Sequence, residues 1–237
     1  MNEPRSENDL PILMPPADTA DRRPLKTRGR PVAHAVARWL ARHGATPNAI
    51  SVAGVVVAAA VGACLVLVPG APTAAAQALL LAGAAAGIQL RLAANMLDGL
   101  VAVEGGLGTR TGPLFNEVPD RLADLLILVS AGYAISWVGW GPELGWAAGA
   151  LALLTAYVRL LGGALGQPQR FSGPLAKPQR MFVLTVACLA SMVELAVSEL
   201  RGVALTAGLA VIVLGCALTI VARLRAIASA LPPEPRR

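Results

Sequence analysis

Long apolar runs are the feature of this sequence that most constrains its fold. Six stretches of roughly twenty residues, made mostly of Ala, Leu, Val and Gly, recur between residues 47 and 226 with few charged side chains inside them. A helix of about 20 apolar residues is long enough to cross the hydrocarbon core of a bilayer. Only 14% of the residues are charged, against about 25% in a soluble domain. The sequence therefore predicts an all-α integral membrane protein.

An amphipathic segment, residues 32–44, precedes the apolar runs. His34, Arg38 and Arg42 recur at a spacing of four, while Trp39 lies on an apolar face. A helix of this kind lies on the membrane surface rather than crossing it. The expected fold is an N-terminal interfacial helix followed by six transmembrane helices. We place these six helices at 47–68, 74–99, 114–138, 144–166, 178–198 and 202–226.

The pattern divides the chain into four segments. Residues 1–31, rich in Pro and charge, are expected to form a disordered cytoplasmic tail, and residues 32–44 the juxtamembrane helix. Residues 45–228 form the membrane domain, and residues 229–237 a C-terminal tail. The basic part of the first tail suits anionic headgroups or serves only as a topology signal. The composition leaves these two roles open.

Basic residues alternate along the chain between the two sides of the predicted membrane domain. The breaks at 68–73 and 137–143 carry no Lys or Arg, and the breaks on the other side carry Arg110, Arg170, Lys177 and Arg180. This pattern predicts that both termini lie in the cytoplasm. It also explains the net charge of +6 better than nucleic-acid binding does, so no nucleic-acid partner is expected. The excess of Arg over Lys fits a bacterial protein, and hence a bacterial inner membrane.

Acidic residues gather in one stretch at the cytoplasmic side. Between Asp21 and Glu143 the acidic residues are Asp98, Glu104, Glu117, Asp120 and Asp124. Carboxylates at membrane depth are costly and usually face a cavity, a partner or an ion. Helical spacing brings the polar residues of two predicted helices to one face of each, and together they offer an oxygen-rich nest for a hard divalent cation such as Mg²⁺. This nest consists of Asn95, Asp98, Asn116 and Asp120.

The remaining acids of the stretch have simpler interpretations. Glu104 and Glu117 are expected to be ordinary solvated acids, and Asp124 is left open between pairing with Arg121 and joining the nest. The glycines of the segment EGGLGTRTG form neither a Walker loop nor a dinucleotide fingerprint, because no Gly-Lys-Ser/Thr closes it and no strand precedes it. They are expected to form a turn between two helices.

The spacing of this stretch resembles the signature of the CDP-alcohol phosphatidyltransferases, Asp-x2-Asp-Gly-x2-Ala-Arg-x8-Gly-x3-Asp-x3-Asp. The segment TPNAIS at 46–51 is similar to a Thr-Pro-Asn segment that opens the first crossing in that family. Spacing agrees throughout and five of the eight identities hold. The residues at the signature positions are Asn95, Asp98, Gly99, Ala102, Val103, Gly112, Asn116 and Asp120.

The resemblance implies a site for a nucleotide diphosphate. In the family the acids bind two divalent cations, Mg²⁺ or Mn²⁺, that hold the pyrophosphate of a CDP-linked donor, and the last Asp deprotonates the attacking hydroxyl. Carried over, Asp98 is a metal ligand and Asp120 a ligand or the base, with Asn95 and Asn116 beside them. The resemblance also implies that the nucleotide lies near Asn48, Gly99, Ala102 and Gly112.

Three departures from the signature bear on this expectation. Asn95 and Asn116 replace acids, so the site loses two negative charges and holds one ion or two, with Asp124 as a compensating ligand. Val103 replaces the signature arginine, and Arg110, in the turn predicted to follow, is a candidate substitute. The basic residues expected to contact a phosphate or the acceptor are Arg110, Arg159, Lys177 and Arg180. For the loop cations among them, a role in topology alone is the alternative.

The resemblance implies an enzyme of phospholipid synthesis. It is expected to transfer a phosphatidyl or other substituted phosphate group from CDP-diacylglycerol or a related CDP-alcohol to a hydroxyl acceptor, with release of CMP. The alternative is a family member that binds lipid or nucleotide without turnover. A transporter is disfavoured because the polar groups gather at one membrane face. Membrane lipids and a second copy of the chain, in a homodimer, are the other expected partners, because small residues on the spans suit self-association.

Overall fold

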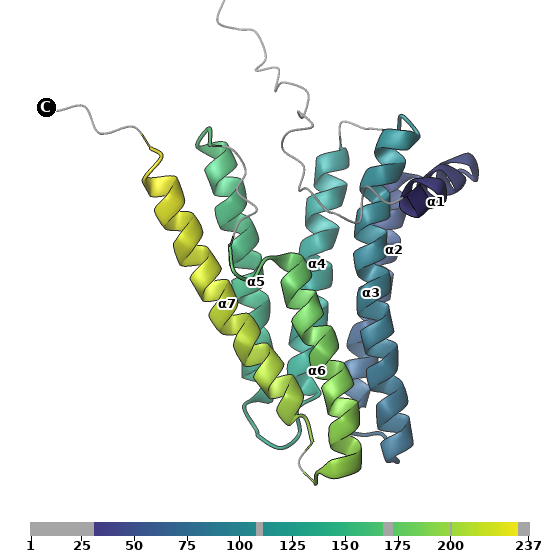
Figure 1. Ribbon diagram of the computed structural model, residues 1–237, viewed down its shortest axis with the longest axis vertical. Helices are drawn as coiled ribbons and strands as arrows, with labels where there is room; N and C mark the ends of the chain where they lie inside the picture. Colours follow the sequence, from purple (N-terminus) through teal and green to yellow (C-terminus); the bar gives the residue numbers. More distant parts are fainter. Residues whose placement is uncertain (1–30, 108–110, 168–172, 200, 232–237) are drawn as a thin grey trace, which may run out of the picture.

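The protein is a bundle of helices in the computed structural model, which describes residues 31–107, 111–167, 173–199 and 201–231. All regular structure in these ranges is helical. Figure 1 shows the long helices running side by side, with the short first helix beside the bundle, near one end. The helices are α1 (Pro31–Arg42), α2 (Pro47–Leu67), α3 (Ala74–Glu104), α4 (Gly112–Tyr133), α5 (Gly141–Ala164), α6 (Lys177–Val197) and α7 (Val203–Ala228).

Side-chain caps fix where the first two long helices begin. The Thr46 hydroxyl oxygen accepts a hydrogen bond from the Ala49 amide at 3.2 Å, and the Thr73 hydroxyl accepts one from the Ala76 amide at 3.1 Å. Such caps satisfy backbone N–H groups that have no partner inside the helix. Helices α2 and α3 therefore begin at residues 47 and 74, as the sequence predicts.

Five helices of the described part are long and apolar enough to cross a membrane, namely α2, α3, α5, α6 and α7. Their outward faces are apolar too: Phe182, Val186, Leu189 and Val193 form an exposed row along α6. The fold is thus that of a multi-pass membrane protein. Helix α4, the remaining predicted span, carries Glu117, Asp120, Arg121 and Asp124, so its charge keeps it outside this group of five.

Two predicted boundaries differ from those observed by five residues, and the others differ by three or fewer. Helix α3 continues to Glu104 instead of ending at 99, and Gly105 and Gly106 stop it, the latter with a φ of 60° that favours glycine. Helix α4 ends at Tyr133 instead of 138. The longer α3 keeps residues 98–102 on a helix, so their side chains project at helical spacing toward neighbouring helices.

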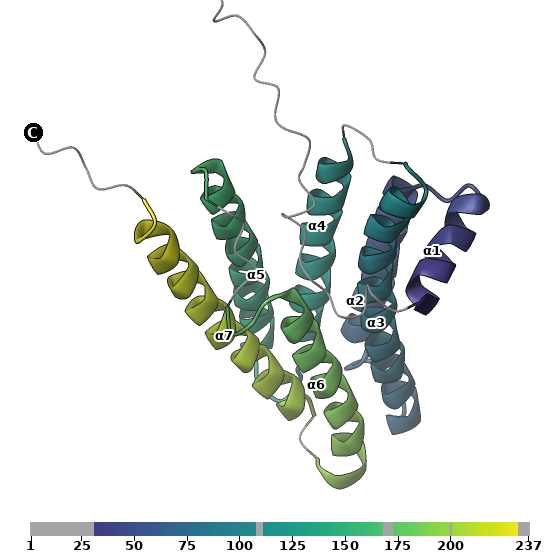
Figure 2. The ribbon, with the colours of Figure 1, turned by 45° about the horizontal axis from the view of Figure 1, so that its top comes forward.

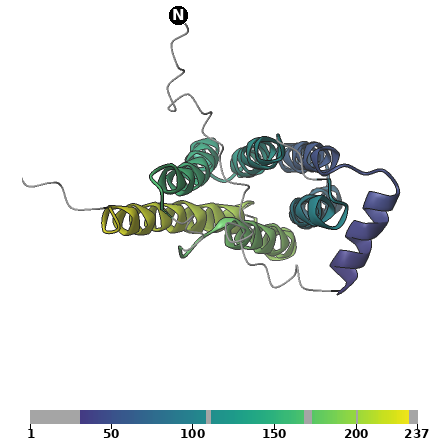
Figure 3. The same cartoon turned by 90° about the horizontal axis from the view of Figure 1, so that it is seen from above.

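The amphipathic helix α1 packs on the side of the bundle formed by α2 and α3 (Figures 2 and 3). Its buried residues Ala33 and Ala37 contact Leu100 and Val101 of α3. On α3, Glu104 accepts a hydrogen bond from the ring of His34 at 2.7 Å and pairs with Arg38 at 3.4 Å. Glu104 is exposed, as expected of a solvated acid, and it also ties α1 to the bundle.

The apolar core and the polar residues occupy different levels of the bundle. The core includes Leu81 and Ile88 of α3, Ile127 and Leu128 of α4 and Leu184 of α6. Beyond Ile88, toward the end where α3 stops and α4 starts, α3 and α4 become polar. Figure 1 shows that α6 begins part-way down the bundle, below the ends of α4 and α5. Its first turn therefore reaches the level of these polar residues.

Candidate functional site

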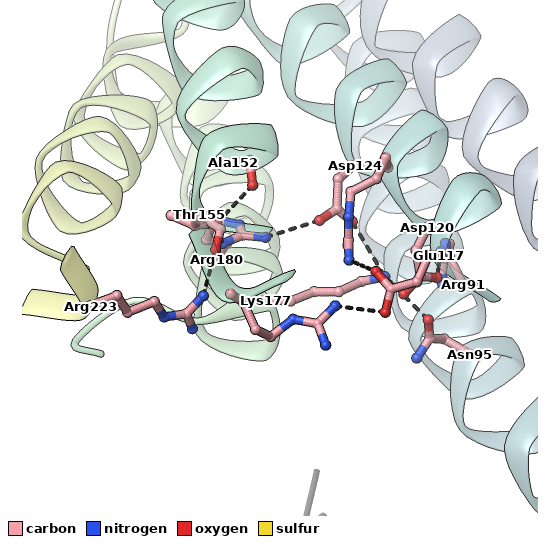
Figure 4. Close-up of polar contacts among 12 residues, drawn as sticks. Arg91, Asn95, Glu117, Asp120, Asp124, Ala152, Thr155, Lys177, Arg180 and Arg223 are labelled. Carbon is pink, nitrogen blue, oxygen red and sulfur yellow. Dashed lines mark hydrogen bonds and ion pairs between the residues drawn. The ribbon is translucent and has the colours of Figure 1, made fainter. Parts of the chain in front are cut away.

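Polar side chains of α3 and α4 meet near the start of α6. Arg91, Asn95 and Asp98 follow one another on α3 at spacings of four and three, so they share one face of that helix. Asp120 and Asp124 share a face of α4 by the same rule. Figure 4 shows Arg91 and Asn95 of α3, and Asp120 and Asp124 of α4, pointing toward Lys177 and Arg180 of α6. The two predicted groups of oxygens thus face a common centre.

Lys177, the first residue of α6, lies at this centre. Its Nζ atom is 2.8 Å from Asp120 Oδ2, 3.2 Å from Asn95 Oδ1 and 3.5 Å from Asp124 Oδ1. One ammonium group therefore bridges α3 and α4. Only 14% of the Lys177 side chain is exposed. The sequence predicted that Lys177 lies in a loop, whereas the structure holds its side chain inside the bundle.

Two arginines complete the pairing of the carboxylates. Arg91 pairs with Asp120 from α3, and Arg180 Nη2 lies 3.0 Å from Asp124 Oδ2. The Arg180 and Asp124 side chains are only 3% and 4% exposed. Ion pairs this deeply buried are rarely tolerated unless both charges find partners. Asp124 therefore joins the site, and the alternative of a pair with Arg121 is not what the structure shows.

Asp98 is held by neutral donors instead. Its Oδ2 atom accepts a hydrogen bond from the Ser51 hydroxyl at 2.8 Å, and its Oδ1 atom accepts one from the Gly99 amide at 2.6 Å. Ser51 ends the segment TPNAIS, so this segment of α2 lies against the acidic stretch. The sequence pointed to the segment TPNAIS, but Ser51 itself was not among the predicted site residues.

A second cluster lies toward the start of α4. Arg159 Nη2 of α5 is 2.6 Å from Glu117 Oε1, and Arg121 pairs with the other oxygen of the same carboxylate. Glu117 is therefore an ion-paired residue rather than the solvated acid predicted. Arg159 was expected to bind an anion, and in the protein its partner is this glutamate.

Two buried arginines were missed by the sequence reasoning. Arg91 is 4% exposed and Arg223 is 6% exposed. Arg223 Nη1 donates to the Thr155 carbonyl oxygen at 2.6 Å, and Arg180 Nη1 donates to the Thr155 hydroxyl at 3.1 Å. A signal was present, because Arg91 is the one charged residue between residues 74 and 97 of a predicted transmembrane helix.

The other predicted residues of the described part lie on α2, α3 and α4, close in sequence to the residues of this cluster. Asn116 is exposed on α4, one turn before Asp120, and Asn48 is half-buried on α2, one turn before Ser51. Gly99 and Ala102 are half-buried farther along α3. Gly112 is the first residue of α4. The predicted residue Arg110 lies outside the described residues.

The donor atoms suit a divalent cation in kind but not in number. Carboxylate and amide oxygens are the ligands that Mg²⁺ and Mn²⁺ prefer. Within the described part of the chain, however, no group of three or more acidic, histidine or cysteine side chains could hold a metal ion. The oxygens of Asn95, Asp120 and Asp124 are taken by cations of the protein. These residues therefore fit a divalent cation by the chemistry of their oxygens, and the Lys177 ammonium group lies between them.

Comparison with known proteins gives one distant relative by sequence and a clear match by fold. No family model matches the chain. Inner membrane protein YnbA of Escherichia coli K12 is 28% identical over 149 residues, which cover 61% of this chain and 67% of that protein.

Crystal structures of the Mycobacterium tuberculosis phosphatidylinositol phosphate synthase PgsA1 have a similar fold. The structure with CDP-DAG bound has a TM-score of 0.67 at 21% identity and covers 87% of this chain and 98% of PgsA1. The complex with manganese and citrate has a TM-score of 0.66 at 21% identity and covers 86% and 93%. The fold expected from the resemblance to the signature is therefore confirmed.

The buried pairs predict how the charges contribute to stability. Arg180→Met should lower the free energy of unfolding by about 3–5 kcal/mol, because it leaves Asp124 charged and buried. The control Arg38→Met removes an exposed partner of Glu104 and should cost about 0–1 kcal/mol. Unfolding in detergent, followed by circular dichroism against denaturant, measures both. Equal losses in the two variants would contradict the described pairing.

Proposed function

We propose that this protein is an enzyme of phospholipid synthesis. It transfers a phosphatidyl or other substituted phosphate group from CDP-diacylglycerol or a related CDP-alcohol to a hydroxyl acceptor and releases CMP. The observation that carries this proposal is that Lys177 joins Asn95 of α3 to Asp120 of α4, with Asp98 one turn from Asn95 on the same helix. The fold shared with PgsA1, whose crystal structures contain CDP-DAG or manganese, supports it.

Asp120 is the proposed general base. Its side chain is 14% exposed, whereas that of Asp124 is 4% exposed, so Asp120 is the more accessible of the two to an acceptor. A carboxylate within hydrogen-bond reach of a hydroxyl group can take its proton as the oxygen attacks phosphorus. Asp124 is held by Arg180 and Lys177 and has the role of fixing those two cations.

Asp98 is a proposed ligand for Mg²⁺ or Mn²⁺, together with Asn95, Asp120 and Asn116. A carboxylate oxygen has more than one lone pair, so the hydrogen bonds from Ser51 and Gly99 leave Asp98 able to coordinate a cation. When bound, a divalent cation neutralises the concentrated charge of the donor's diphosphate. The Ser51 hydroxyl fixes the direction of the carboxylate and is a further proposed site residue.

The nucleotide is proposed to lie along the α3 end of this site. Gly99 and Ala102 have small side chains on the half-buried face beyond Asp98, which permits close approach of a ligand to the helix backbone. Asn48 is one turn from Ser51 on α2, and Gly112 begins α4. These four residues are the proposed nucleotide contacts.

The basic residues on the α5 and α6 side are proposed to bind a phosphate of the donor or the acceptor. Arg159, Lys177 and Arg180 come from two helices, and Thr155 connects Arg180 with the buried Arg223. Arginine presents several N–H donors in a fixed plane that matches phosphate oxygens. Arg110, which lies outside the described residues, stays a proposed contact from the sequence.

A second function is favoured by one specific observation. Asn95, Asn116 and Val103 replace three residues of the signature, and protein cations already hold Asp120 and Asp124. A protein that binds the lipid or the nucleotide without turning it over would tolerate both features. CDP binding in the absence of CMP release would favour this alternative.

Turnover distinguishes the two proposals. We expect the purified protein to release CMP from CDP-diacylglycerol with Mg²⁺ or Mn²⁺ and at least one member of a panel of polyols and polyol phosphates. Asp120→Asn should lower the rate by about 10²–10⁴-fold, as for loss of a general base. Asp98→Ala should abolish release, whereas the control Glu104→Gln, whose carboxylate contacts α1, should not. If no acceptor gave more CMP than Asp98→Ala, catalysis would be rejected.

We also propose that the protein is a homodimer in a bacterial inner membrane, with both termini in the cytoplasm. The exposed apolar rows of the bundle, such as Phe182 and Val193 on α6, support contact with lipid or with a second copy. The mass of the particle in native lipid nanodiscs tests the assembly. Twice the mass of the chain is expected, and a monomeric mass would contradict the dimer.

A further inference from the structure

Lys177 takes the geometric position of a metal ion. Its ammonium group lies within 3.5 Å of three oxygen atoms, which belong to Asn95 of α3 and to Asp120 and Asp124 of α4. Asn95 and Asp120 are two of the residues whose signature counterparts bind metal.

The charges around this ammonium group already cancel. Asp98, Asp120 and Asp124 supply three negative charges, and Arg91, Lys177 and Arg180 supply three positive ones. Acids at positions 95 and 116, as in the signature, would leave the same cluster with an excess of two negative charges. That excess equals the charge of one divalent cation. With asparagine at both positions the cluster has no such excess.

The start of a helix does not by itself favour a cation such as Lys177. A cation in the first turn of a helix is opposed by the helix dipole. The lysine is instead drawn to the carboxylates of α4, which lie across from it. A lysine also differs from an arginine in having a compact charge on a flexible stem, so it can leave a site by rotation of its side chain alone.

We infer that Lys177 is the resident cation of this site. Its ammonium group competes with divalent cations for Asn95, Asp120 and Asp124, so a metal ion binds there only by displacing it, and the chain binds fewer ions than the full signature would. The inference rests on the metal-binding role in the proposed function. It does not require turnover, because binding of a metal ion is measured separately from release of CMP.

Titration of the full-length protein in lipid nanodiscs with Mn²⁺, followed by electron paramagnetic resonance, tests the competition. Lys177→Gln should bind Mn²⁺ about tenfold or more tightly than the wild type, because a positive charge is removed next to its ligands. The control Arg38→Gln loses the same charge from the Glu104 pair and should bind as the wild type does. Equal or weaker binding by Lys177→Gln would overturn the inference.

A second measurement needs no substitution in the site. The chain has only two lysines, Lys26 and Lys177. In a Lys26→Arg protein labelled with ¹³Cε-lysine, the single lysine resonance reports Lys177. Addition of Mg²⁺, at concentrations that compete with Mn²⁺ in the resonance titration, should shift this signal to that of a free, solvated lysine. An unchanged signal at saturating Mg²⁺ would show that the ion binds elsewhere and would overturn the inference.

The two proposals can fail separately. If no acceptor gives CMP release, the proposed enzymatic activity is rejected. The Mn²⁺ affinities of the wild type and Lys177→Gln still test the role of Lys177. Equal Mn²⁺ affinities in an active protein defeat the role of Lys177 and leave the enzyme in place.

Discussion

Pairing of carboxylates with cations inside an apolar bundle is the interaction on which the rest of this structure depends. A charge taken out of water costs several kcal/mol unless a partner meets it. Asp124 is 3% exposed and is met by Arg180 and Lys177. Both cations come from the first turn of α6, so α6 has to begin at the level of Asp124. Its late start in the bundle follows from this pairing (Figure 1).

The same pairing creates a site that a ligand can enter only by exchange. Arg91 and Lys177 hold Asp120, and Ser51 holds Asp98, so the oxygens are oriented before any ligand arrives. An anionic ligand can compete for the cations, and a divalent cation can compete for the carboxylates. An apolar cluster of the same volume would be at least as stable. Stability alone therefore does not require these charges, which is consistent with the proposed binding role.

The sequence predicted the helices well because their signals are local. Thr46 and Thr73 cap α2 and α3 at the predicted residues, and the apolar runs set the helix lengths. It also named Asp98 and Asp120, because charge inside an apolar run is conspicuous, and Lys177 and Arg180 as basic residues of a predicted loop. It did not name their partners. The pairs Arg91–Asp120, Ser51–Asp98 and Lys177–Asn95 join different helices, and only the packing of α2, α3, α4 and α6 decides which side chains meet.

The position of a bound ion tests the central claim most directly. A crystal structure with Mn²⁺ and CDP-diacylglycerol, phased near the manganese absorption edge, locates the ion by its anomalous scattering. The account predicts one peak between α3 and α4, in contact with Asp98 or Asn95 and with Asp120, and a Lys177 side chain turned away from them. A peak at another place in the bundle, or α3 and α4 with their oxygen-bearing side chains pointing apart, would contradict it.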